Sequence, residues 1–82
     1  MSNLDNQRKL YPYCWFLERQ DSPESKWEIV SRDNDEDVMR TRYQYSDEQL
    51  KPGQGVRLIS PDGTIPVQRQ LDKQPDAGIV KK

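Results

Sequence analysis

Acidic, basic and aromatic side chains that could bind a ligand or a partner are concentrated in residues 33–45. Three of the acids, in the pattern D-x-D-x-D from Asp33 to Asp37, have the spacing that opens a calcium-binding loop. The rest of that loop is missing, because its required glycine falls at Val38 and its closing glutamate falls at Gln44. We therefore interpret the acids as a helix start or an anionic patch, and we predict no metal site.

Arginine and tyrosine side chains follow the acids in the same segment. Guanidinium groups pair with phosphates or carboxylates, and tyrosine rings stack on bases or pack in protein interfaces. An anionic patch favours association with a basic surface, including a surface that is meant for nucleic acid. We predict that this segment contacts a macromolecular partner through eight residues: Asp33, Asp35, Glu36, Asp37, Arg40, Arg42, Tyr43 and Tyr45.

The composition argues against an enzyme. The chain has 82 residues, no histidine and a single cysteine, Cys14. Histidine is the commonest general base and metal ligand, and a lone cysteine can form neither an internal disulfide nor a four-thiolate zinc site. The sequence Gly53-Gln54-Gly55 lacks the spacing and the following Lys-Ser/Thr of a phosphate-binding loop. We expect a non-enzymatic protein without a cofactor, in a reducing compartment.

The candidate segment lies between two predicted β-hairpins. Strands are predicted at residues 11–19 and 27–31, and the polar turn between them is too short for a parallel crossover. The first strand is apolar on both faces, which is typical of a central strand. Strands at 56–60 and 64–70 flank a Ser-Pro-Asp-Gly turn, and Pro66 indicates that the last strand is an edge.

The segment 33–51 fits two structures. A helix is indicated by Asp33 as a capping residue, by Glu36 three residues later, and by Met39 and Tyr43 on one face. A strand is indicated by the alternation of threonine and tyrosine with arginine. The helix gives an α+β fold, ββαββ, with one helix on a small antiparallel sheet. The strand gives an all-β, five-stranded barrel of SH3-like or OB-like type. We favour the helix.

The polar ends of the chain set the predicted domain boundaries. Residues 1–9 and 72–82 are predicted to be flexible, so that a single small domain covers residues 10–71. No stretch approaches the roughly 20 apolar residues of a membrane span. The first residues lack the charged start and apolar middle of a signal peptide. We therefore expect a cytoplasmic protein that does not insert into membranes.

A thin core favours a binding protein over an enzyme. Apolar residues make up 32% of the chain, so a partner or a second copy in a homodimer could add burial. We predict a small regulatory or inhibitory protein, such as a phage-type inhibitor or an accessory factor, that masks or bridges a protein partner. The alternative is a nucleic-acid-binding module with an Arg/Tyr surface. The net charge of −1 differs from the strongly basic character of most such domains.

Overall fold

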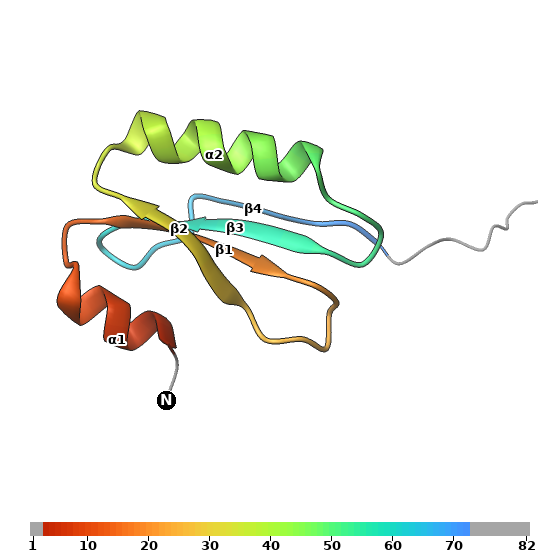
Figure 1. The fold of residues 1–82 in the computed structure, drawn as a ribbon, viewed down its shortest axis with the longest axis horizontal. Helices are drawn as coiled ribbons and strands as arrows, with labels where there is room; N and C mark the ends of the chain where they lie inside the picture. Colours follow the sequence, from red (N-terminus) through yellow and green to blue (C-terminus); the bar gives the residue numbers. More distant parts are fainter. Residues whose placement is uncertain (1–2, 73–82) are drawn as a thin grey trace, which may run out of the picture.

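The computed structural model describes residues 3–72, which form two helices and a four-stranded antiparallel sheet. Figure 1 shows α2 on one face of the sheet and α1 on the other. The predicted α+β fold with a ββαββ order is confirmed, and the barrel alternative is wrong because the sheet is open. The elements are α1 (Asn3–Leu10), β1 (Trp15–Gln20), β2 (Glu28–Asp33), α2 (Glu36–Glu48), β3 (Gly55–Ile59) and β4 (Val67–Gln70).

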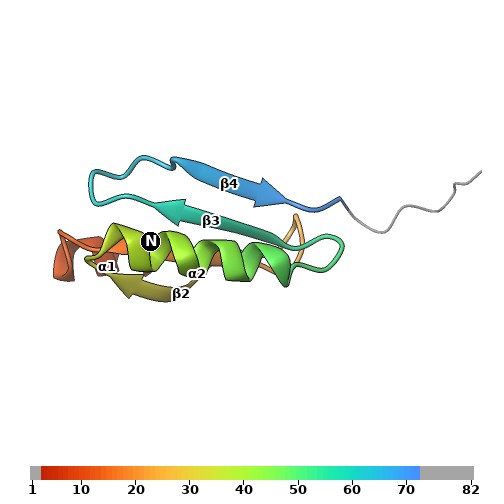
Figure 2. The same ribbon diagram turned by 90° about the horizontal axis from the view of Figure 1, so that it is seen from above.

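The strand order β2-β1-β3-β4 makes β1 a central strand and makes β2 and β4 the edges. All three strand pairings are antiparallel. The central position of β1 follows from its apolar character, because Phe16 and Leu17 point to opposite faces and both are buried. Helix α2 connects the edge strand β2 to β3, and Figure 2 shows it crossing over the sheet between them.

The face beneath α2 holds the main apolar core. Leu17, Met39, Val56 and Leu58 form one buried cluster, and each is no more than 2% exposed. Met39 comes from the helix position that the sequence predicted to face the sheet. Tyr43 packs against the margin of this cluster. Burial of such side chains stabilises the fold by about 1.5–3 kcal/mol each, so this cluster holds α2 on the sheet.

Acidic side chains fix the start of α2. Asp35 is the N-cap, and its carboxylate accepts a hydrogen bond from the backbone N–H of Val38 at 3.2 Å. Asp33, which the sequence predicted as the cap, lies two residues too early because β2 continues to that residue. Its carboxylate instead accepts from the backbone N–H of Asp35 at 2.9 Å and closes the turn between β2 and α2.

The opposite face of the sheet combines an apolar pair with an ion pair. Phe16 and Ile59 are cross-strand neighbours, and each is 1% exposed. Glu18, which is 2% exposed, pairs with the guanidinium of Arg57 at 2.6 Å. The Cζ atom of Arg57 lies 4.3 Å from the ring centroid of Trp27. The cation is therefore held between a carboxylate and an aromatic ring.

The N-terminal end of the fold contains an element that the sequence did not predict. The sequence indicates no element in residues 1–9, whereas α1 begins at Asn3, and Arg8 donates to the carbonyl of Pro61 at 3.4 Å. The first strand begins at Trp15 and not at residue 11. The predicted flexible tail at 72–82 lies, apart from its first residue, outside the described residues. Neither of the two helices described is long and apolar enough to cross a membrane.

Replacing Met39 with alanine is expected to lower the free energy of unfolding by about 2–5 kcal/mol. The physical reason is the cavity left between α2 and the sheet, and urea unfolding followed by circular dichroism measures the change. Tyr45→Ala is the matched control, because Tyr45 lies on the same helix and is 66% exposed. Its effect should stay within about 0.5 kcal/mol. Equal losses in the two variants would contradict the position of Met39 in the core.

Replacing Glu18 with alanine is expected to lower the free energy of unfolding by about 3 kcal/mol, because it leaves Arg57 partly buried without its counter-ion. A double variant, Glu18→Leu with Arg57→Leu, should be more stable than Glu18→Ala, because no unpaired charge remains. Thermal unfolding of the two variants provides the comparison. A double variant that is less stable than Glu18→Ala would show that the ion pair is not the reason for the loss.

Candidate partner-binding groove

The predicted acids lie at the junction of β2 and α2, and three of them serve the local structure. Asp33 and Asp35 accept the hydrogen bonds that start the helix. Glu36 pairs with the Nε of Arg40, one turn later, at 2.6 Å. Asp37 is exposed in the first turn of α2. The charge of this acidic cluster is therefore partly balanced within the chain.

The predicted arginines and tyrosines divide between two sides of α2. Tyr43 is half-buried against the core, and burial, followed by the negative charge of Asp47, raises the pKa of its hydroxyl. Arg40 is held by its ion pair on the helix surface. Arg42 and Tyr45 point toward the edge strand β2 and line a groove there. The structure therefore brings two of the eight predicted residues together in a concave surface.

This groove lies between α2 and β2 and has a volume of about 490 Å³. Strands β1 and β2 supply one wall, and one side of the helix supplies the other. The lining combines apolar side chains, a tyrosine, three serine or threonine hydroxyls and two guanidinium groups. We call it the α2–β2 groove, and its residues are Leu17, Arg19, Val30, Ser31, Thr41, Arg42, Tyr45 and Ser46.

A β-bulge places an apolar side chain in the groove. Leu17 pairs with Ser31 and Glu18 pairs with Ile29, so Val30 is an extra residue without a partner on β1. Bulges of this kind redirect side chains and occur often at sheet edges and beside functional sites. Val30 is 52% exposed within the groove lining. Sequence reasoning missed this position, because an inserted residue leaves no turn residue that would mark it.

Neighbouring side chains hold both guanidinium groups at the groove. Arg42 donates from Nη1 to the Oγ of Ser31 at 2.7 Å, and its Nη2 lies 4.0 Å from the carboxylate of Asp33. Arg19 donates from Nη2 to the Oε1 of Gln54 at 3.3 Å. A guanidinium carries five N–H donors in a planar fork. These contacts therefore orient both groups and leave donors for a partner.

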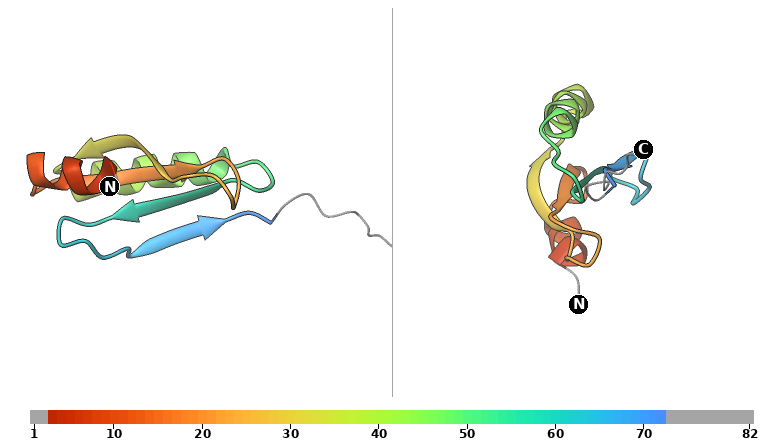
Figure 3. Two further views of the ribbon diagram at one scale, coloured as in Figure 1. Left: turned by 90° about the horizontal axis from the view of Figure 1, so that it is seen from below. Right: turned by 90° about the vertical axis from the view of Figure 1, so that its right-hand side faces the viewer.

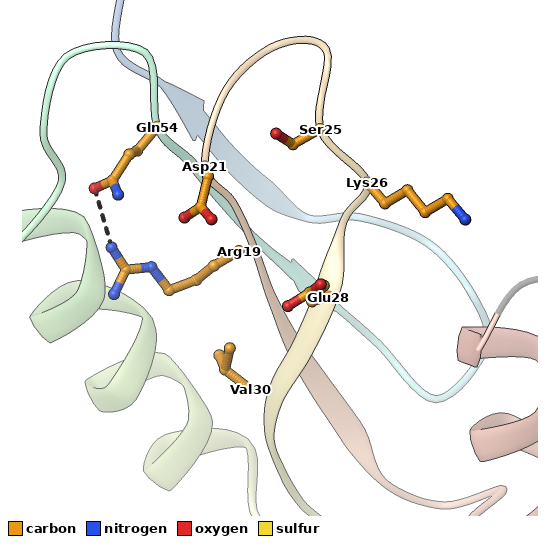
Figure 4. A pocket seen from close by; sticks show the side chains of 7 residues that line it. All are labelled: Arg19, Asp21, Ser25, Lys26, Glu28, Val30 and Gln54. Atoms are coloured by element: carbon orange, nitrogen blue, oxygen red, sulfur yellow. Dashed lines mark hydrogen bonds between the residues drawn. The ribbon is translucent and has the colours of Figure 1, made fainter.

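A second hollow continues from the groove at the end of the β1–β2 hairpin. It has a volume of about 370 Å³ and shares Arg19 and Val30 with the groove, so the two form one concave path along β2. Figure 4 shows Arg19 directed at Gln54 across this hollow. We call it the turn pocket, and its residues are Arg19, Asp21, Ser25, Lys26, Glu28, Val30 and Gln54.

A separate polar cluster in the β3–β4 turn is structural. The carboxylate of Asp62 accepts hydrogen bonds from the hydroxyls of Ser60 and Thr64 and from the backbone N–H of Thr64. These bonds favour the ionised form and lower the pKa of Asp62 to about 2. Gly63, with φ of +92°, completes the turn. The partners of this carboxylate all belong to its own turn, so the cluster stabilises the hairpin.

Comparisons with known proteins supply no function for the chain. Protein-family models, curated proteins and solved structures were all searched, and none of them matches it. Among residues 3–72, no group of three or more histidine, cysteine, aspartate or glutamate side chains is placed to hold a metal ion.

Asp62 is expected to titrate near pH 2 in the folded protein, which carboxyl ¹³C NMR can follow directly. The folded pKa lies below the ordinary value of 3.8, so the stabilisation is complete above that value and is lost as the pH falls to about 2. The stability advantage of the natural chain over Asp62→Ala should therefore be constant near neutral pH and shrink within this acidic range. A carboxyl group that titrates at its ordinary value would contradict the hydrogen-bonded turn.

Proposed function

We propose that this chain is a non-enzymatic protein-binding module and that the α2–β2 groove is its principal contact surface. The observation that carries this proposal is the exposure of Val30 and Tyr45 beside Arg42 in a concave surface. Tyrosine and arginine are enriched among the residues that dominate binding energy in protein interfaces. An apolar surface with a polar rim is typical of an interaction site.

The chemistry of the groove favours binding over catalysis. Its lining offers the hydroxyls of Ser31, Thr41 and Ser46 as nucleophiles. No histidine, carboxylate or amine among the lining residues of this groove can act as their general base. The guanidinium groups of Arg19 and Arg42 are donors for a partner's carboxylates and carbonyls. These groups support recognition of a polypeptide and do not support hydrolysis or group transfer.

A regulatory or inhibitory role agrees with these features. A small binding domain acts on its partner by masking a surface or by bridging two proteins. The acidic cluster at the start of α2 is a second predicted contact, where Asp35 and Asp37 would select a partner with a basic surface. The groove supplies apolar and hydrogen-bonding contact, while the acidic cluster would influence the rate and selectivity of association.

The nucleic-acid alternative has less support. It requires Arg40, Arg42, Tyr43 and Tyr45 to form one surface for phosphates and bases. Arg40 is paired with an acid and Tyr43 packs against the core, so only Arg42 and Tyr45 lie together in the groove. Bases can stack only on aromatic rings that are accessible, and the ring of Tyr43 packs against the core.

A pull-down from a lysate of the native host, with and without nuclease, tests the proposed function. The tagged natural chain should capture a protein that survives nuclease, and Val30→Asp and Tyr45→Ala should each weaken capture by about tenfold or more. Ile65→Asp is the matched control, because Ile65 is an exposed apolar residue, 42% accessible, outside the groove.

The outcomes of this pull-down separate the two functions. If Val30→Asp and Ile65→Asp reduce capture of the protein equally, the groove is not the contact surface. Capture that disappears with nuclease would favour the nucleic-acid alternative. In that case binding should weaken steeply as the salt concentration rises.

A further inference from the structure

We propose that the partner inserts an extended acidic segment into the α2–β2 groove and adds it as a strand to the free edge of β2. This inference rests on the proposed function, because it names the chemistry of the segment that the groove would accept. Three observations carry it: the charge of the groove lining, the open edge of the sheet, and the apolar side chain exposed at the bulge.

The charge of the groove calls for an anionic ligand. Arg19 and Arg42 are the two charged residues that line the groove, and the carboxylate of Asp33 lies beside it, 4.0 Å from Nη2 of Arg42. Arg42 is bonded to Ser31, which lies opposite Leu17, and Arg19 lies two residues further along β1. Two residues of a strand span about 7 Å, the same repeat at which alternate side chains of an extended peptide recur. Acidic side chains at alternate positions of one segment therefore have the same spacing along the strand direction as these two positions.

The edge of the sheet supplies main-chain partners for such a segment. β2 pairs with β1 on one side only, so backbone groups on its outer side have no partner within the sheet. The right-hand view of Figure 3 shows β2 as the outer margin of the sheet, with α2 above it. A peptide that pairs with β2 would therefore lie along α2. In this mode of recognition the main chain gives affinity and the side-chain contacts give specificity.

The bulge makes pairing at this edge selective. An irregular register at Val30, together with the charges of Glu28 and Arg32, discourages indiscriminate pairing of β2 with other strands. A segment that binds here must gain additional energy from side-chain contacts in the groove. Val30 and Tyr45 provide apolar surface for such a contact. The expected segment therefore carries an apolar residue among its acids.

An NMR titration of the full ¹⁵N-labelled chain tests the charge of the segment. The probe is a capped peptide of sequence Glu-Thr-Glu-Thr-Val, whose two glutamates are at alternate positions and share a face with the valine. The control peptide has lysine in place of both glutamates. The acidic peptide should shift the amide signals of Val30, Ser31, Arg42 and Tyr45, and the lysine peptide should not. Arg19→Gln and Arg42→Gln should each lower the affinity of the chain for the acidic peptide by about tenfold. No shift at millimolar acidic peptide would overturn the proposal.

Two substitutions at Val30 separate charge from apolar contact. Val30→Glu and Val30→Lys remove the same apolar surface and leave opposite charges at an exposed position. The acidic peptide should bind Val30→Lys more tightly than Val30→Glu by about tenfold, and both spectra should remain those of the folded chain. Equal affinities for the two variants would show that the groove does not select an acidic segment.

Two N-methylated peptides test the addition of a strand. One analogue of the acidic peptide is methylated at both threonine amides, and the other at the amides of the second glutamate and the valine, so that each loses two hydrogen-bond donors of one edge. An added strand uses one edge only, because alternate residues of a strand hydrogen-bond to opposite sides. One analogue should therefore lose binding and the other should keep it. Unchanged binding of both analogues would overturn strand addition.

The failure of this inference is distinguishable from the failure of the proposed function. If Val30→Asp abolishes capture of the partner but the acidic peptide causes no shift, the groove binds a protein and the assignment of an acidic strand is wrong. If capture does not depend on the groove, the proposed function fails at this site. The free chain could also self-associate, and Val30→Lys could abolish that self-association. This result would show that a second copy of the chain occupies the groove, and it would overturn the proposal of an acidic segment.

Discussion

The whole structure depends on the burial of both faces of β1. Leu17 lies under α2 and Phe16 lies on the opposite face, so β1 must sit inside the sheet with β2 and β3 on either side. Helix α2 must then cross one face of the sheet to connect β2 with β3. Four strands about 4.8 Å apart span about 14 Å, whereas a helix is about 10 Å wide. One helix therefore leaves a margin of the sheet uncovered, and the α2–β2 groove occupies such a margin.

The two margins of α2 differ in how far side-chain contacts close them. On the β4 side, Asp47 of the helix pairs with Arg69 of the strand at 3.3 Å, and this ion pair bridges the margin. On the β2 side, Arg42 contacts the strand, but Tyr45 and Val30 remain more than half exposed. Water contact with such apolar surface does not stabilise a folded monomer. Burial by the proposed partner would give these side chains a physical role.

Elements of the fold were predictable where a local pattern of residues determines them. They were not predictable where a tertiary contact determines whether the element forms. The apolar run of β1 and the acidic start of α2 gave a central strand and a helix. Helix α1 has eight polar-rich residues, and so short a helix is marginal alone. Its Arg8 contact with Pro61 forms only in the folded chain. The groove depends on the bulge at Val30 and on the side of α2 from which each side chain projects. Arg42 and Tyr45 were therefore predicted, but Val30 and Arg19 were not.

Helix α2 carries both residues that hold the fold together and residues of the proposed binding groove. The two sets lie on different sides of the helix, but the position of one depends on the other. Met39 fixes the helix to the sheet, whereas Arg42 and Tyr45 project from another side of the same helix toward β2. Exposed positions of this kind contribute little to stability, so their types are free to suit a partner. Their positions are not free, because a packed core transmits small displacements. Met39 shares its buried cluster with Leu17 of β1, so this core sets the distance between α2 and the sheet, and with it the width of the groove that a partner would meet.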